Sequence, residues 1–99
     1  MIELGIASFY GHSWDTAVTG QYTASGEAFN ADLITFAHKT GPLKRWAFFI
    51  CLDTGRMAWA WLNDRGPYVE GRSFDASEAL AERLGFIEAG TARCLVIRF

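Results

Sequence analysis

A short segment of the sequence places a carboxylate and a guanidinium where a predicted strand ends. Asp64 and Arg65 follow an uncharged run at 57–62, and Gly66-Pro67 comes directly after them. A strand that ends at such a turn holds a carboxylate rigidly beside a groove, where it can exchange a proton with a ligand. A plain turn with a local Asp-Arg ion pair is the simpler interpretation of this segment by itself.

Three further side chains suit acid–base chemistry, and each also has a structural explanation. Glu27 follows a polar, glycine-containing segment at 11–26, and long loops in small domains are often functional. His38 lies between an apolar run and a turn, where a histidine is more often a hydrogen-bonded structural residue than a catalyst. Asp75 stands three residues before Glu78, the spacing of an acceptor and an acid that cap a helix together.

Four aromatic side chains are candidates for stacking on a ligand. Trp14 and Tyr22 lie in segment 11–26, while Tyr10 and Tyr68 lie close to the predicted strand ends. Packing within the loop or along a groove edge explains them equally well.

The elements that must position these residues are mostly strands. Apolar periodicity predicts strands at 2–10, 33–37, 46–52, 57–62 and 91–99, and one short helix at about 76–84 that Asp75 opens and Gly85 ends. A small, mostly β chain favours a closed barrel, because closure leaves few strand edges exposed.

The central hairpin has two apolar faces. With a turn at 53–56, Phe48 faces Trp61 and Ile50 faces Trp59, while the alternate residues form the other face. One barrel core covers only one face. We therefore predict that the other face packs on a partner, most simply a second copy in a homodimer; a fold of segment 11–26 over it is an equal alternative.

Composition narrows the class of protein. The 99 residues predict one domain, 1–99, and a net charge of −2 without a basic run gives no indication of a nucleic-acid-binding surface. No apolar stretch reaches the ~18–20 residues of a membrane span. The first residues lack the basic start and apolar core of a signal peptide, so we expect a chain that works where it is made, an excised piece, or export by another route.

The two cysteines, Cys51 and Cys94, are too few for a disulfide framework and too far apart for a metal-binding motif. Two buried free thiols are the default expectation, and a single bridge stays open. We predict neither a metal nor a cofactor.

Seven short motifs, in order along the chain, resemble one known family. They are GIASFYG (5–11), TASGE (23–27), AHKT (37–40), PL (42–43), NDRGP (63–67), FDAS (74–77) and GTAR (90–93). Together they resemble the rare lipoprotein A (RlpA) domain, a six-stranded double-psi β-barrel related to the first domain of expansins and to family 45 endoglucanases. The match covers nearly the whole chain.

The resemblance implies an activity. Active members of the family are lytic transglycosylases that cleave the glycan strands of peptidoglycan, with a preference for strands stripped of stem peptides. By resemblance, Asp64 is the catalytic acid, and Glu27 and His38 lie in the same groove. The C6 hydroxyl of the substrate attacks in this reaction, so one residue can act first as acid and then as base. We expect Asp64 in that role, Glu27 as a stabilising charge and His38 as a positioning group.

The remaining groove residues are predicted to bind substrate. They are Tyr10, Asn30, Asn63, Arg65, Tyr68 and Asp75. We expect the guanidinium of Arg65 to point away from Asp64. The family often has aspartate at the position of Asn30, and an amide there can bind a sugar but carries no charge.

Two other functions remain open at this point. One is an expansin-like module that binds and loosens glycan without cutting it, and the other is a barrel reused as a phage or effector interaction domain. The enzyme would act at the cell wall or in the periplasm, and a phage-encoded protein or an excised domain would fit a chain without a signal peptide.

Overall fold

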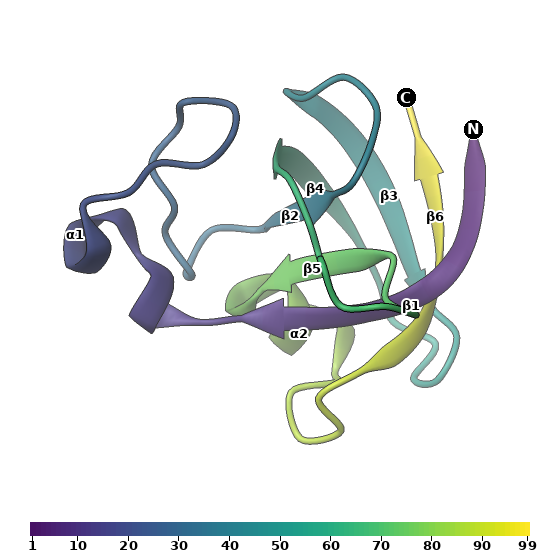
Figure 1. The fold of residues 1–99 in the computed structure, drawn as a ribbon. Helices are drawn as coiled ribbons and strands as arrows, with labels where there is room; N and C mark the ends of the chain where they lie inside the picture. The colour runs from purple at the N-terminus through teal and green to yellow at the C-terminus, as the bar shows by residue number, and fades with distance from the viewer.

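Six β-strands close into a barrel in the computed structural model, which describes residues 1–99 (Figure 1). The strands are β1 (Ile2–Tyr10), β2 (Thr35–His38), β3 (Arg45–Cys51), β4 (Met57–Asp64), β5 (Phe74–Ser77) and β6 (Ala92–Arg98). Their order around the barrel is β1-β5-β2-β4-β3-β6, and β6 pairs with β1 to close it. The pairs β1–β5 and β2–β4 are parallel, and the other four pairs are antiparallel. The predicted mostly β, six-stranded barrel is confirmed.

The predicted strands agree with the observed ones to within about two residues, with one exception. β1 has the predicted bounds, but β5 was not predicted as a strand at all. β5 has only four residues, and it runs directly into the helix α2 (Glu78–Leu84). Four residues are too few to show a periodic pattern. The partner strands β1 and β2 are far away in sequence, so no hairpin signal identified β5 either.

The start of α2 corrects the prediction for Asp75. Asp75 lies inside β5, and the N-cap of α2 is Ser77, whose hydroxyl accepts a hydrogen bond from the N–H of Leu80 at 3.2 Å. The end of α2 is as predicted, because Gly85 adopts a left-handed conformation with φ 83°. Asp75 is therefore free of any capping role.

The hairpin of β3 and β4 also needs one correction. Phe48 pairs with Trp59 and Ile50 with Met57, a shift of two residues from the predicted register, because β3 ends at Cys51 and Leu52 belongs to the turn. A shift of two keeps every side chain on its predicted face. The inward residues form the barrel core together with apolar side chains of the other strands and α2.

The outward face of four neighbouring strands is apolar. We call this the outer apolar face; it comprises Ile2, Leu4, Trp46, Phe48, Ile50, Met57, Trp59, Trp61, Leu95, Ile97 and Phe99. Trp46 and Trp59 remain 53% and 52% exposed, so segment 11–26 does not cover them and the alternative of a loop folded over this face is wrong for these two residues. Trp61 is more protected, since its indole donates to the carboxylate of Glu27.

Segment 11–26 contains short helical turns instead of a continuous loop. They are a 3-10 helix at His12–Trp14 and α1 (Thr16–Thr19), which lie apart from the barrel at the left of Figure 1. The N–H of Ala31 donates to Asp15 and the N–H of Phe29 donates to Thr16, which ties the segment to the chain that follows it. None of the helices is long and apolar enough to cross a membrane.

Candidate functional site

A row of four residues across four strands defines the candidate site. Ser8 of β1 pairs with Asp75 of β5, Asp75 pairs with Ala37 of β2, and Ala37 pairs with Asp64 of β4. Ala37 thus lies between two acids, each on a directly neighbouring strand. Adjacent strands are ~4.8 Å apart, so the α-carbons of the two aspartates are separated by roughly 10 Å.

A β-bulge places Asp64 in this row. Phe36 pairs with Leu62, but the next residue, Ala37, pairs with Asp64, so Asn63 is an extra residue in β4. Bulges of this kind often redirect a side chain beside an active site. Here the bulge moves Asp64 opposite Ala37, where Asn63 would otherwise lie.

The carboxylate of Asp64 is held by hydrogen bonds. Its Oδ1 accepts from the backbone N–H groups of Ala24 at 3.0 Å and of Arg65 at 2.8 Å. Its Oδ2 lies 3.5 Å from the hydroxyl of Tyr10, which donates to it. These three donors hold the carboxylate in one orientation.

Asp75 has a different environment. Burial raises the pKa of Asp75; the Ser8 hydroxyl, which donates to its Oδ1 at 3.1 Å, and the charge of Arg72 oppose this shift, while the charge of Asp64 adds to it. Asp75 is therefore inclined to keep a proton.

The hydroxyl of Tyr10 lies close to Asp64. Burial raises the pKa of its phenol, and the charges of Asp64 and Asp75 raise it further, so the hydroxyl stays neutral and can donate a hydrogen bond. Its ring stacks on Phe29 with centroids 4.3 Å apart. This packing fixes the hydroxyl at one position next to Asp64.

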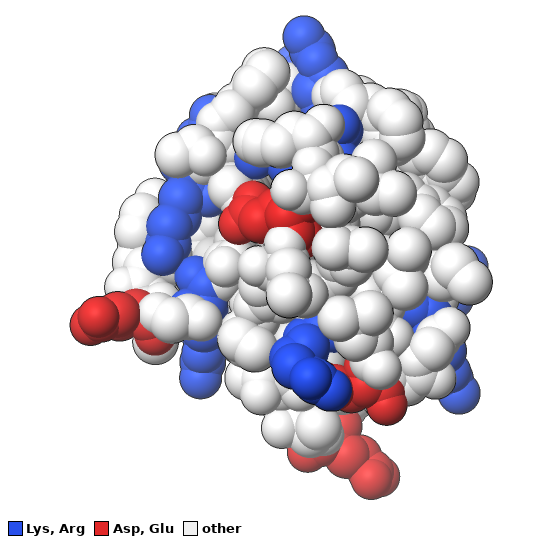
Figure 2. All heavy atoms as spheres, turned by 90° about the vertical axis from the view of Figure 1, so that its right-hand side faces the viewer, with Lys and Arg blue, Asp and Glu red and all other residues white.

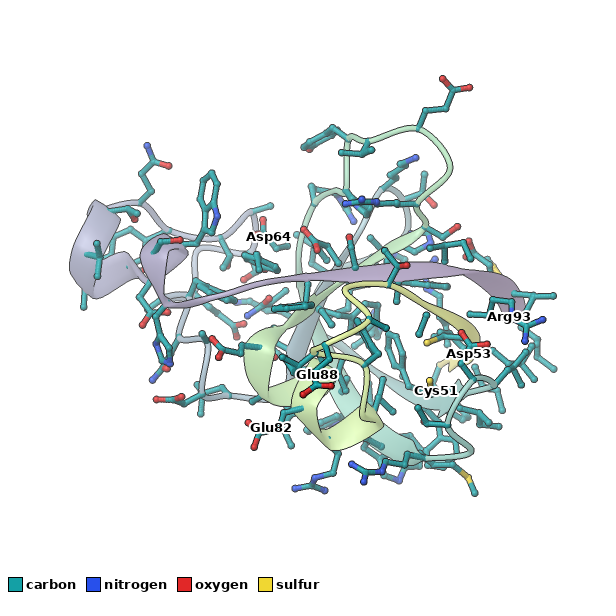
Figure 3. The ribbon with its side chains drawn as sticks, turned by 90° about the horizontal axis from the view of Figure 1, so that it is seen from below. Cys51, Asp53, Asp64, Glu82, Glu88 and Arg93 are labelled. Atoms are coloured by element: carbon teal, nitrogen blue, oxygen red, sulfur yellow. The ribbon has the colours of Figure 1, made fainter.

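Two adjoining hollows lie along this row. One, of about 350 Å³, contains Asp64 and Asp75, and the other, of about 400 Å³, continues past Asp64 toward Ala24. Both hollows are lined by Tyr10, Trp14, Asp64, Arg65 and Tyr68. We call the two together the groove. Figure 3 shows Asp64 far from Cys51, Asp53 and Arg93, which lie at the other end of the barrel.

Aromatic side chains form the exposed walls of the groove. Tyr68 is 84% exposed and Trp14 is 58% exposed, so both rings are available for stacking on a ligand. The guanidinium of Arg65 points away from Asp64, as expected, and donates to the carbonyls of Gly41 at 2.6 Å and His38 at 3.4 Å.

The sequence missed Ser8 and Arg72. Both line the groove and act on Asp75, through a hydrogen bond and through charge respectively. The alternation of β1 places Ser8 outward, and this was a usable signal once Asp75 was known to lie beside it.

The three predicted catalytic side chains do not all meet in the groove. His38 follows Ala37 on β2, so its ring leaves the opposite face of the strand, where its Nε2 lies 2.8 Å from Glu3 and its ring packs on the core residue Phe74. The predicted convergence is therefore wrong for His38. Glu27 lines neither hollow, and its carboxylate accepts from the indole of Trp61 at 3.0 Å.

Two predicted substrate-binding residues also lie outside the groove. Asn30 is exposed, and its Oδ1 accepts from the N–H of Asp32 at 2.9 Å within a local turn. Asn63 is 3% exposed, and its Oδ1 is buried without a hydrogen-bond partner. The structure thus brings together Asp64, Asp75, Tyr10, Arg65 and Tyr68 from the predicted set.

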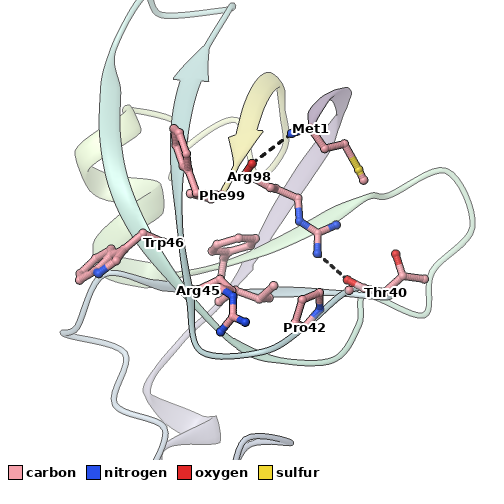
Figure 4. A pocket seen from close by; sticks show the side chains of 11 residues that line it. Met1, Thr40, Pro42, Arg45, Trp46, Arg98 and Phe99 are labelled. Atoms are coloured by element: carbon pink, nitrogen blue, oxygen red, sulfur yellow. Dashed lines mark hydrogen bonds between the residues drawn. The ribbon is translucent and has the colours of Figure 1, made fainter.

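A separate hollow of about 290 Å³ opens elsewhere on the barrel (Figure 4). The side chain of Arg98 crosses it and donates to the carbonyl of Thr40 at 2.7 Å, while the terminal amine of Met1 donates to the carbonyl of Arg98. The hollow is lined by Arg45 and Arg98 but by no carboxylate, so it lacks an acid for catalysis.

Comparisons with known proteins find relatives over nearly the whole chain. A family model described as "Lytic transglycolase" matches residues 2–96. The "Endolytic peptidoglycan transglycosylase RlpA" of Pseudomonas aeruginosa (strain PAO1) is 43% identical over 93 residues, which is 94% of this chain and 26% of that protein. The protein of the same name from Pasteurella multocida is 41% identical over 92 residues, 93% of this chain and 30% of that one. The chain thus spans less than a third of the length of these relatives.

Solved structures share the fold at low sequence identity. The "Streptomyces papain inhibitor (SPI)" has a TM-score of 0.71 and 19% identity, covering 99% of this chain and 96% of that one. An expansin from Clavibacter michiganensis has a TM-score of 0.74 and 18% identity, covering all of this chain and half of that one. These likenesses support the double-psi barrel architecture.

Proposed function

The chain belongs to the lytic transglycolase family of RlpA-like double-psi β-barrels, and from this premise we propose that it cleaves the glycan strands of peptidoglycan at the cell wall. The observation that carries the proposal is the pair of aspartates on either side of Ala37, in one groove and in different environments. Glycosidic bond cleavage commonly uses two carboxyl groups beside the scissile bond, one of which delivers a proton.

The two acids suit different steps. The sequence led us to expect Asp64 as acid and base, but two backbone N–H groups and the Tyr10 hydroxyl already donate to its carboxylate and hold it in one orientation. We assign the proton to Asp75, whose pKa is raised by burial. Asp64, oriented by the Tyr10 hydroxyl, then stabilises the positive charge that develops on the sugar ring.

The reaction follows from these roles. Asp75 donates its proton to the glycosidic oxygen, and the bond from that oxygen to C1 of the muramic sugar breaks. The Asp75 carboxylate next removes the proton from the C6 hydroxyl, and O6 bonds to C1. The product ends in a 1,6-anhydro ring, and Asp75 is protonated again.

The glycan has room along the groove. The exposed rings of Trp14 and Tyr68 offer apolar faces for sugar rings, and Arg65 and Arg72 line the same hollow as the two acids. Glu27 and His38 lie away from the reacting groups and act as positioning residues in this proposal.

Digestion of purified, peptide-free glycan strands with mass analysis of the products tests the function. We expect 1,6-anhydro ends from the parent protein and a loss of ~10²–10⁴-fold in rate for Asp75→Asn, as for removal of a general acid. Asp64→Asn should also lose most turnover. Full activity in Asp75→Asn with none in Asp64→Asn would return the acid role to Asp64.

Two other product patterns would contradict the proposal. Reducing ends instead of anhydro ends would identify a hydrolase, in which a second carboxylate activates water. Glycan binding without any cleavage, in the parent and in both variants, would identify a binding module that loosens glycan.

We further propose that the outer apolar face is the interface of a homodimer. Of its side chains, Ile2, Leu4, Trp46, Met57, Trp59 and Phe99 are each more than half exposed. At ~200 Å² for a large apolar side chain, these six present on the order of 700 Å². A standard interface buries about 800 Å² on each partner, so the face has the area that a stable dimer needs.

The pattern of charge also fits an interface. Two rows of paired residues that cross this face carry no charge: Leu4–Leu95–Ile50–Met57 and Ile2–Ile97–Phe48–Trp59. The ion pair of Asp53 with Arg93 lies beyond them. Figure 2 shows this side of the molecule with an acidic group near the middle of the view and an uncharged area beside it. An apolar centre with charges at its rim is the usual anatomy of a protein interface.

Light scattering over a range of concentrations tests the dimer. We expect a dimer for the parent, a monomer for Trp59→Lys, and a dimer for the control Val18→Lys, which replaces a 70% exposed apolar residue of α1. A parent protein that stays monomeric at high concentration would exclude a second copy as the partner.

A further inference from the structure

The two cysteines face each other inside the barrel, and the proposed reaction uses neither. Cys51 of β3 and Cys94 of β6 are direct partners in the strand register, although 42 residues separate them in sequence. Both side chains are fully buried within the hydrophobic core. From the sequence, two buried free thiols were the default expectation and a single bridge stayed open; in the structure both thiols are free and buried.

The type of pairing decides how close the two residues are. The N–H of Leu52 donates to the carbonyl of Arg93 at 2.8 Å, so the neighbouring pair of residues 52 and 93 is hydrogen-bonded. Hydrogen-bonded and non-hydrogen-bonded pairs alternate along an antiparallel ladder, so Cys51 and Cys94 form a non-hydrogen-bonded pair. The α-carbons of such a pair are ~4.5 Å apart, within the ~4.4–6.8 Å that disulfides span.

The folded barrel protects these thiols from reaction. Burial raises the pKa of the Cys94 thiol to about 12, and the neighbouring Cys51 adds to the shift. Both thiols are fully buried in the closed barrel, so an external disulfide does not reach either of them. A bond between them must therefore form while β3 and β6 are still coming together.

We propose that Cys51 and Cys94 are a site of covalent modification and form a cross-strand disulfide during folding. One thiolate attacks an external disulfide, such as oxidised glutathione or the disulfide of a thiol oxidoreductase, and expels one thiol. The second cysteine then attacks the mixed disulfide and expels the other thiol. The two cysteines lose two protons and two electrons, and the external disulfide is reduced to two thiols.

The bond would close a loop that contains the catalytic elements. β4, β5 and α2 all lie between the two cysteines, and so do Asp64 and Asp75. A crosslink across a loop of this length restricts the unfolded chain strongly. The disulfide therefore stabilises the groove without touching it.

Refolding of the reduced protein in a mixture of oxidised and reduced glutathione tests the proposal. We expect an intact mass lower by about 2 Da than the reduced chain, and no free thiol on titration in denaturant, because two S–H groups become one S–S bond. Dithiothreitol should then lower the melting temperature by on the order of 10–20 °C. The Cys51→Ala, Cys94→Ala double variant should show no response to dithiothreitol.

Three results would overturn the proposal. The first is a folded protein with two titratable thiols after oxidative refolding. The second is a disulfide-linked dimer on a non-reducing gel, which would show that the cysteines pair between chains. The third is a glutathione adduct on the folded protein, which would show that the second exchange step fails. The intact mass of the refolded parent protein shows whether the disulfide has formed, even if the double variant does not fold.

Discussion

Ser77→Ala is expected to destabilise the fold more than any groove substitution. The Ser77 side chain is fully buried and makes three hydrogen bonds. Its Oγ accepts from the N–H of Leu80 and of Thr35, each at 3.2 Å, and donates to the carbonyl of Leu33 at 2.6 Å. One hydroxyl thus joins α2, β2 and the chain before β2.

The magnitude follows from these three contacts. Loss of a helix N-cap costs ~1 kcal/mol, and each buried backbone group left without a partner costs ~1–3 kcal/mol. Partial relaxation lowers the sum, so we expect the free energy of unfolding to fall by about 3 kcal/mol. For a domain of this size, that is a drop of roughly 12–24 °C in melting temperature.

Urea and thermal unfolding measure the effect, with Ser13→Ala as the matched control. Ser13 is exposed, so its substitution should change stability by less than ~0.5 kcal/mol. A loss below ~1 kcal/mol for Ser77→Ala would refute the reasoning, because it would show that water or a neighbouring group replaces the hydroxyl. A parallel loss for Asp75→Ala would return the capping role to Asp75.

Three further predictions concern the site residues. Asp75→Asn should melt at a higher temperature than the parent at pH 7 and at the same temperature near pH 3. Because the pKa of Asp75 is raised in the folded state, its protonated form favours folding at low pH, and this contribution is lost as the pH rises through the folded-state pKa. A scan of melting temperature against pH checks the sign. His38→Ala should lower the free energy of unfolding by about 2 kcal/mol in urea, because the contacts with Glu3, Thr40 and Arg98 are lost. An unchanged free energy of unfolding together with lost turnover would instead make His38 a catalytic residue. Asn30→Asp should leave turnover on glycan unchanged, because Asn30 lies in a local turn; increased activity would show that a second charge acts at that position.

The parts of the fold that depend on local pattern could be predicted from the sequence. The alternation of 2–10 and 91–99 identified β1 and β6, and Gly85 identified the end of α2. The barrel itself came from the resemblance of seven motifs, because periodicity indicated only a mostly β chain. The position of Asp64 at a strand end was also visible in the sequence.

The parts of the fold and of the site that depend on pairing between distant strands could not be predicted from the sequence. Asp75 resembles a cap until β5 is known to pair with β1 and β2, and only then does it lie on a strand beside the groove. His38 was grouped with Asp64 by resemblance, but its direction depends on the side of β2 that faces the core. The cysteine pair depends on the register of β3 with β6, which no local pattern reports.

The pairing of Ala37 with both Asp64 and Asp75 limits how the sequence of this barrel can change in evolution. The spacing between the two acids is set by backbone hydrogen bonds across β2, while the groove walls that carry Trp14 and Tyr68 lie outside the strands. Loops tolerate insertion and substitution far better than paired strands do. The residues proposed to contact the glycan can therefore diverge while the distance between the carboxyl groups stays constant, so under the proposed function substrate preference and bond cleavage can evolve independently on this barrel.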